Sequence, residues 1–157
     1  MSAPTLHAPH SRPRRVSRLA LAGAMLAPLL AAAEPAVMDI AIPAPAEAKL
    51  EIISPANGAK VTSPVTVQFG LAGMGVAPAG IEAKNTGHHH LIIDAPLPDT
   101  AFAIPKDAKH RHFGGGQTQV TLELTPGTHT LQLLLGDFRH IPHNPPVSSK
   151  RITITVE

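Results

Sequence analysis

Apolar residues in the C-terminal two thirds of this chain alternate with polar ones, so their period is two residues. Val65, Val67 and Phe69 are separated by single polar residues, and residues 152–156 repeat the pattern. Successive side chains of a β-strand point to opposite faces, so this period predicts half-buried strands. No stretch has the 3.6-residue apolar stripe of an amphipathic helix. The pattern therefore predicts an all-β fold.

Runs of this kind recur along the chain, with turn-forming residues between them. The strands predicted from alternation are residues 50–52, 65–71, 120–124, 131–135 and 152–156, and residues 88–93 end in an apolar, strand-like run. The turn signal Pro126-Gly127 lies between residues 117–124 and 129–135, which we expect to form a hairpin-like pair. The number and shortness of the runs predict an immunoglobulin-like antiparallel β-sandwich of about seven short strands.

The first 33 residues have the pattern of a secretory signal peptide. Four arginines precede an apolar run at residues 19–30, and the alanines ending at Ala33 offer a cleavage site. The run contains Pro28 and is shorter than the roughly 20 residues of a membrane-spanning helix. We therefore predict a signal peptide at 1–33 and a periplasmic or secreted protein, not inserted in the membrane after cleavage. The sequence leaves open general secretory or twin-arginine export.

The remaining chain divides into a linker and one domain. Residues 34–48 are dominated by Ala and Pro, which predicts a linker, and residues 49–157 suffice for one compact domain. Removal of the signal takes four of the 13 basic residues, which changes the formal net charge from +2 to −2. Because Trp and Tyr are also absent, nucleic acid is not an expected partner.

Three consecutive histidines directly precede an apolar run. If residues 88–93 are extended, His88 and His90 share one face about 7 Å apart, and His89 points to the other face. Neutral imidazole is the commonest protein ligand of transition metals, and two imidazoles at this spacing can bind one ion. The segment therefore indicates a metal site on one face of a strand.

Two more histidine pairs lie farther along the chain. His110 and His112 repeat the spacing before a glycine run, and His140 and His143 lie in a Pro-rich turn. Three pairs on three connecting regions could converge at one end of the sandwich. The candidate metal ligands are His88, His90, His110, His112, His140 and His143. For any single position the alternative is a structural histidine that is hydrogen-bonded to the backbone.

The other conspicuous residues are expected to have structural roles. His129 is in phase with the leucines that follow it and is expected to be buried, as is His89 if its face is the core. Asp94 and Asp137 either orient imidazole rings or cap turns. The glycine run 114–116 is expected to form a turn or bulge. The chain has no cysteine, so thiolate ligands and disulfides are excluded.

Several longer motifs together resemble a known family. They are GHHHLIID, HFGGGQT, PGTHTLQLLLGD and HIPHNPPVSSKRITITV, preceded by SPANGAKV. These segments closely resemble the exported bacterial family named domain of unknown function 4399, over nearly the whole of residues 49–157. The resemblance implies an exported single domain, and it implies no particular activity, substrate or cofactor.

The residues favour a binding domain over an enzyme. Neither G-x-S-x-G nor H-E-x-x-H occurs, although three imidazoles with an open position would suffice for a hydrolytic metal site. We predict a non-enzymatic periplasmic domain that binds copper(II) or zinc(II); copper(I) is less favoured because only Met38 and Met74 would accompany the histidines. The alternatives are a metal-independent module that binds an envelope protein and a pH-responsive module with structural histidines.

Overall fold

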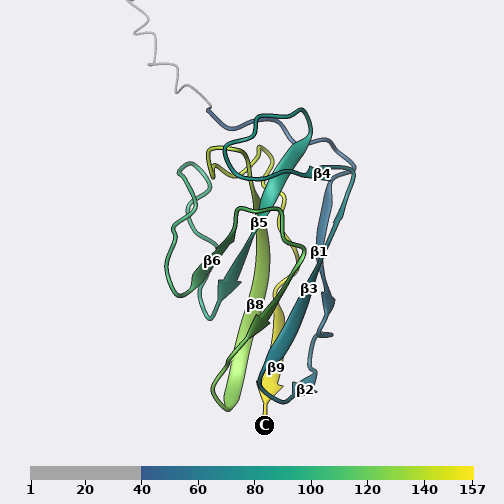
Figure 1. The fold of residues 1–157 in the computed structure, drawn as a ribbon, viewed down its shortest axis with the longest axis vertical. Coiled ribbons are helices and arrows are strands. Elements are labelled where there is room, and N and C mark those ends of the chain that lie inside the picture. The colour runs from purple at the N-terminus through teal and green to yellow at the C-terminus, as the bar shows by residue number, and fades with distance from the viewer. Residues whose placement is uncertain (1–39) are drawn as a thin grey trace, which may run out of the picture. The chain divides into compact units, whose positions relative to one another are not determined.

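The computed structural model describes residues 40–157, in which there are nine β-strands and no helix (Figure 1). The strands are β1 (Lys49–Ser54), β2 (Lys60–Val61), β3 (Val65–Ala72), β4 (Gly75–Val76), β5 (Thr86–Ile93), β6 (His110–Phe113), β7 (Gln119–Leu122), β8 (Gly127–Gly136) and β9 (Ile152–Val156). Within this part of the chain, no helix is long and apolar enough to cross a membrane. The predicted signal peptide and residues 34–39 of the predicted linker lie outside the described residues.

The strands form two sheets. One sheet has three strands in the order β1-β3-β7, and the other has the order β2-β9-β8-β5-β4, with β6 paired to β5. Neighbours are antiparallel except the two shortest strands, because β2 is parallel to β9 and β4 is parallel to β5. The all-β sandwich that the alternating pattern predicted is confirmed. Its immunoglobulin-like type stays a prediction.

The main core lies between the two sheets and is built by alternate residues. On β3 the apolar residues Val65, Val67 and Phe69 are buried, and the polar residues between them are exposed. The opposite sheet contributes apolar residues of β5, β8 and β9. The buried cluster comprises Leu50, Val65, Val67, Phe69, Leu91, Ile93, Phe113, Leu122, Leu131, Leu133, Leu135, Val147, Ile152, Ile154 and Val156. Burial of this apolar surface is the main stabilising contribution to the fold.

Strands β7 and β8 do not form the hairpin-like pair expected from the turn at Pro126-Gly127. β7 pairs with β3 in one sheet, whereas β8 pairs with β5 and β9 in the other. The chain crosses between sheets at this point. The prediction was wrong because each strand has one apolar face, and crossing allows Leu122 and Leu133 to enter the same core from opposite sheets.

Strand β5 is the element that positions the histidines. It lies between β8 and β6, and every residue from Gly87 to Ile93 is buried. The sequence placed His110 and His112 on a connecting region, which is wrong, because they belong to β6. Antiparallel pairing of β6 with β5 sets His112 directly opposite His90.

The outer face of β5, which points away from the three-stranded sheet, is covered by two long connections. In the connection of residues 94–109, Ile104 packs against Ile92 and Leu134 in a second apolar cluster. Its backbone N–H also donates to the carbonyl oxygen of His140, 2.8 Å away, which ties this connection to the one between β8 and β9. A region of sheet that would otherwise be exposed is thereby enclosed.

Part of the predicted linker pairs with the connection between β8 and β9. The backbone N–H of Ala44 donates to the carbonyl of Asn144, and the N–H of Asn144 donates to Ile42, each over 3.0 Å. The guanidinium of Arg139 donates to the carbonyl of Ile40 over 2.6 Å. Residues 40–44 therefore contact the segment that contains His140 and His143.

Candidate metal site

Four imidazole rings meet on the outer face of β5, and we call them the four-histidine cluster: His88, His90, His112 and His140. Their ring centroids are 4.8–5.2 Å apart for five of the six pairs and 5.9 Å apart for His90 and His140. One ligand nitrogen from each of the first three rings lies within 4.8 Å of the others. Three separate segments of the chain therefore bring their side chains to one point.

Three of the four positions follow from strand geometry. His88 and His90 are two residues apart on β5 and share a face, as the alternation predicted. His112 comes from the paired position on β6, where directly opposed side chains are close neighbours. The sequence suggested that the pairs could meet at an end of the sandwich, but the cluster lies on the outer face of the six-stranded sheet.

His140 reaches the cluster through a tightly held loop. Its backbone has a φ of 70°, a left-handed conformation that is uncommon for a residue other than glycine. The buried carboxylate of Asp137 accepts the backbone N–H groups of Arg139 and Ile141 at 2.7 and 3.0 Å. The Arg139 guanidinium also donates to it, at 2.8 Å. Asp137 therefore caps this turn, which is one of the two roles that the sequence left open.

Two glycines make room for the rings. A Cβ atom on Gly114 would lie 2.3 Å from Cε1 of His112, and one on Gly136 would lie 2.8 Å from Cε1 of His90. The sequence predicts a turn at the first of these glycines, and no role was predicted for the second. The signal was available in Gly136, which follows three leucines on β8 where a bulky residue would suit a strand better.

Several ring nitrogens of the cluster are buried without hydrogen-bond partners. Both nitrogens of His88 and Nδ1 of His90 are in this state. An unsatisfied buried polar group costs about 1–3 kcal/mol, so such groups are rare in native proteins. Nε2 of His112 lies 3.2 Å from Nε2 of His140. Nitrogens bound to one tetrahedral ion at 2.0–2.1 Å would be separated by about 3.4 Å.

Burial favours the neutral form of His88, His90 and His112. Desolvation, together with the nearby His140 and His112, lowers the pKa of His88 to about 4. Desolvation, together with the nearby His88, His112 and His140, lowers the pKa of His90 to about 2. The pKa of His112 is lowered by desolvation, by His140 and by Lys106. A neutral imidazole keeps one nitrogen lone pair, which metal coordination requires.

Two of the six candidate ligands lie outside the cluster. Within the described residues, no ring contact joins His110 or His143 to it. His110 instead lies 3.0 Å from a carboxylate oxygen of Asp107 through Nδ1. His143 is buried, and desolvation lowers its pKa, which the charge of Asp137 partly offsets.

His89 is buried in the core as expected, whereas His129, which was expected to be buried, is only partly buried. His89 points into the main core, where its ring packs 5.1 Å from that of Phe69. His129 is partly buried and uses both nitrogens, at 2.7 Å from Asp94 Oδ2 and 2.9 Å from the carbonyl oxygen of Thr125. The hydrogen bond to the Asp94 carboxylate raises the pKa of His129, which favours the imidazolium form.

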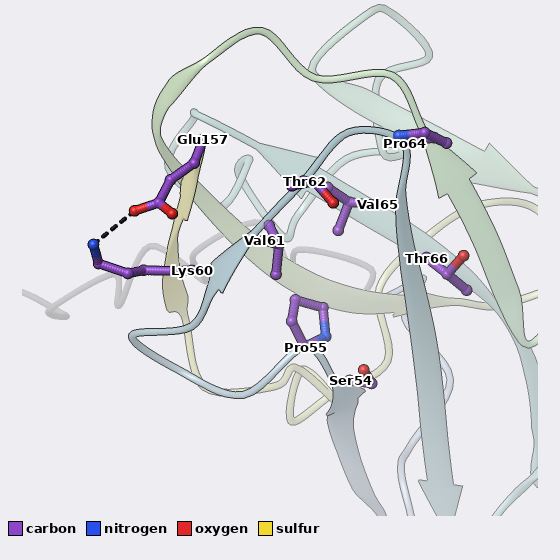
Figure 2. A pocket seen from close by; sticks show the side chains of 9 residues that line it. All are labelled: Ser54, Pro55, Lys60, Val61, Thr62, Pro64, Val65, Thr66 and Glu157. Carbon is purple, nitrogen blue, oxygen red and sulfur yellow. Dashed lines mark hydrogen bonds and ion pairs between the residues drawn. The ribbon is translucent and has the colours of Figure 1, made fainter.

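A surface pocket elsewhere on the domain differs from the cluster in its lining. It has a volume of about 410 Å³ and lies beside β2 and the C-terminal end of β9, without any histidine among its lining residues (Figure 2). Its charged groups, Lys60 and Glu157, pair with each other at 2.6 Å, and both are largely exposed. Such exposed pairs contribute little to stability and leave no unpaired ligand group.

The fold and the cluster define a β-sandwich domain with four converging histidines, two of which are buried. A family model described as Domain of unknown function (DUF4399) matches residues 67–157, which is more than half of the chain. The chain therefore belongs to this family, as its motifs indicated. No curated protein and no solved structure matches it. The matched range includes all four histidines of the cluster.

Proposed function

We propose that this protein is an exported, non-enzymatic domain that binds one divalent transition metal ion, copper(II) or zinc(II), through the four-histidine cluster. The observation on which the proposal rests is the convergence of four rings, two of which, His88 and His90, have buried nitrogens without protein partners. His88, His90 and His112 are the core ligands, and His140 is the fourth imidazole at the same point. A bound ion would engage one nitrogen of each ring and so remove part of the cost of the unpaired nitrogens.

The ligand chemistry supports copper(II) or zinc(II) over other ions. Imidazole suits both metals, whereas calcium and magnesium prefer oxygen ligands. The described residues place no carboxylate oxygen in the set of mutually close ligand atoms. For the same ligands, affinity rises from zinc(II) to copper(II), so copper(II) is expected to bind more tightly.

The compartment proposed for this function follows from the N-terminal sequence. The signal-like residues 1–33 and the absence of cysteine fit a protein that works in the periplasm and binds its metal without thiolates. In this proposal the partner is the metal ion itself, with an envelope protein as a further candidate.

The alternative function is a pH-responsive module, because buried neutral histidines also make a protein sensitive to acid. A metal-independent, pH-responsive module would use the same low pKa values of His88 and His90 to loosen the covering loops when the rings become charged. It would do so equally with and without metal. The two proposals therefore differ in whether metal ions bind at all.

Calorimetric titration of tag-free protein with copper(II) and zinc(II) tests the proposal, since a histidine tag would itself bind metal. We expect one ion per chain with a dissociation constant well below micromolar, and tighter binding of copper(II). Elemental analysis of the purified protein should show nearly one equivalent of metal. Binding only above about 100 µM would contradict the proposal and favour the metal-independent module.

A further inference from the structure

A surface pocket adjoins the four-histidine cluster. It has a volume of about 310 Å³ and is lined by Lys106, Asp107, His110, Arg111 and His112. His112 belongs both to this pocket and to the cluster. The pocket therefore leads from solvent to one of the rings that the proposed function assigns as a metal ligand, whereas His88 and His90 are almost completely buried.

His110 has the bonding pattern of a prepared metal ligand. Its Nδ1 lies 3.0 and 3.1 Å from the two carboxylate oxygens of Asp107. The same carboxylate accepts the backbone N–H groups of Lys109 and His110 at 2.7 and 2.9 Å, so its position is fixed. A carboxylate can only accept, so Nδ1 donates and the lone pair of the neutral ring is on Nε2. In the described part of the chain, no group hydrogen-bonds to this Nε2.

Carboxylate–imidazole pairs of this kind commonly orient metal-binding histidines and increase the basicity of the ligand nitrogen. His110 and His112 alternate on β6, so they share a face and are about 7 Å apart along the strand. A metal ion held by His110 is therefore within reach of His112, whose ring belongs to the cluster.

Charge alone does not attract a cation to this pocket. The cationic groups of Lys106 and Arg111 line it together with one carboxylate, that of Asp107, which is already engaged with His110. An incoming divalent ion can be retained there only by coordination, and Nε2 of His110 is the nitrogen that the geometry offers.

We propose that His110 is the capture ligand of this protein: it binds an incoming copper(II) or zinc(II) ion at Nε2 in the pocket and passes it to His112, from which the ion enters the four-histidine cluster. This inference rests on the proposed function. His110 does not belong to the final site, because it has no ring contact with the cluster among the described residues. It therefore affects the rates of binding and release and not the equilibrium.

His129 offers a matched control. It is also a strand histidine paired with an aspartate, and its side chain is 13% exposed against 14% for His110. The difference is at Nε2, which in His129 is engaged by the carbonyl of Thr125 over 2.9 Å. His129 thus has the same kind of carboxylate partner and no free lone pair.

Stopped-flow mixing of the tag-free protein with zinc(II) or copper(II), in a buffer that does not coordinate metal, measures the effect. We expect His110→Ala to slow association at least about tenfold and to slow release by the same factor, with the dissociation constant changed less than twofold. Asp107→Asn should slow association less, because an amide oxygen can still accept from Nδ1 but the carboxylate charge that increases the basicity of Nε2 is lost. His129→Ala should leave both rates unchanged.

Two results would overturn the capture role while leaving the proposed function intact. The first is an unchanged association rate in His110→Ala. The second is a larger dissociation constant of His110→Ala that is caused by faster release, which would make His110 a ligand of the final complex. If the parent protein itself binds no metal, the proposed function fails together with this inference. Circular dichroism of each variant confirms that the fold is retained.

Discussion

The two faces of β5 put the same kind of side chain to different uses. On the inner face, His89 packs against Phe69 in the core, and its Nδ1 lies 3.1 Å from the carbonyl oxygen of Gln117. On the outer face, His88 and His90 meet two more imidazoles, and three of their four ring nitrogens are buried without a partner. All three residues are buried, so burial does not distinguish them.

The difference lies in what each ring meets. His89 also has one buried nitrogen without a partner, but its neighbours are apolar side chains and one backbone carbonyl. The outer rings meet other imidazoles, which offer several lone pairs to one point. Convergence of ligands on a common point, more than the burial or polarity of a single histidine, therefore marks the candidate site.

The largest expected effect is the loss of metal affinity when histidines on the outer face of β5 are replaced. The double substitution His88→Leu and His90→Leu removes two of the four proposed ligands and should weaken copper(II) binding by about 1,000-fold or more. His89→Leu, which changes only the inner face, should leave affinity within about threefold. Calorimetry or competition with a chromophoric chelator measures both. Equal loss of affinity in the two variants would contradict the assignment of the metal site to the outer face.

Acid should destabilise the metal-free protein through the outer face. The pKa of His88 in the folded protein is about 4, below its ordinary value of 6.5, because of burial and its histidine neighbours. The unfolded state therefore binds more protons than the folded state below pH 6.5, and the free energy of unfolding falls from there toward pH 4. Urea unfolding at several pH values measures this slope. In the metal-free His88→Leu variant the slope should be smaller.

His129 provides the opposite sign. Its pKa is raised by Asp94, so its contribution to stability is fully present below pH 6.5 and is lost as pH rises through the higher folded value. His129→Gln should therefore lower stability more at pH 6 than at pH 9. Relative to the parent, His88→Leu and His129→Gln should change the slope of unfolding free energy against pH in opposite directions. Changes in the same direction would contradict these assignments.

Replacing an outer-face histidine by an apolar residue should stabilise the metal-free protein. His88 is completely buried and neither nitrogen has a partner, so His88→Leu removes an unsatisfied polar group at similar volume. We expect a gain of about 1–2 kcal/mol in the free energy of unfolding at pH 7.5, measured with urea. On the inner face, His89→Ala should instead cost about 2–4 kcal/mol, because it leaves a cavity beside Phe69. Destabilisation by His88→Leu would show that its ring has a structural role.

The smallest effect concerns the space around one ring. A Cβ on Gly114 would collide with the ring of His112, so Gly114→Ala should displace that ring and weaken metal binding by about tenfold. The fold should tolerate the change, because the colliding atoms are at the end of a side chain. Gly115→Ala is the matched control, since its nearest neighbours belong to the exposed Gln117. Equal affinities of the two variants would mean that His112 is not positioned by this glycine.

Local patterns predicted most of the strands and one face of the site. Alternation located β1, β3, β7, β8 and β9. For the histidine segment, the assumption of an extended chain placed His88 and His90 on the same side of a strand, because side-chain direction in a strand is a local property. Sheet membership was not predictable in the same way. It depends on pairing between distant segments, and the separation of β7 from β8 shows that a turn signal alone does not determine it.

The rest of the site depends on long-range contacts. His112 joins the cluster because β6 pairs with β5, and its four residues are too few for a convincing periodic signal. His140 joins because Asp137 holds its loop in a particular conformation, whereas His143, three residues later, lies outside the cluster. Spacing in the sequence did not separate these two histidines.

The most direct test of the central claim is a zinc(II) titration followed by long-range proton–nitrogen NMR of the histidine rings in tag-free protein. With one equivalent of zinc(II), we predict that a ring nitrogen of each of His88, His90, His112 and His140 shifts and that the rings of His89 and His129 keep their positions. If one equivalent leaves the four outer rings unchanged, or shifts His89 as strongly as His88, the four-histidine cluster is not the metal site.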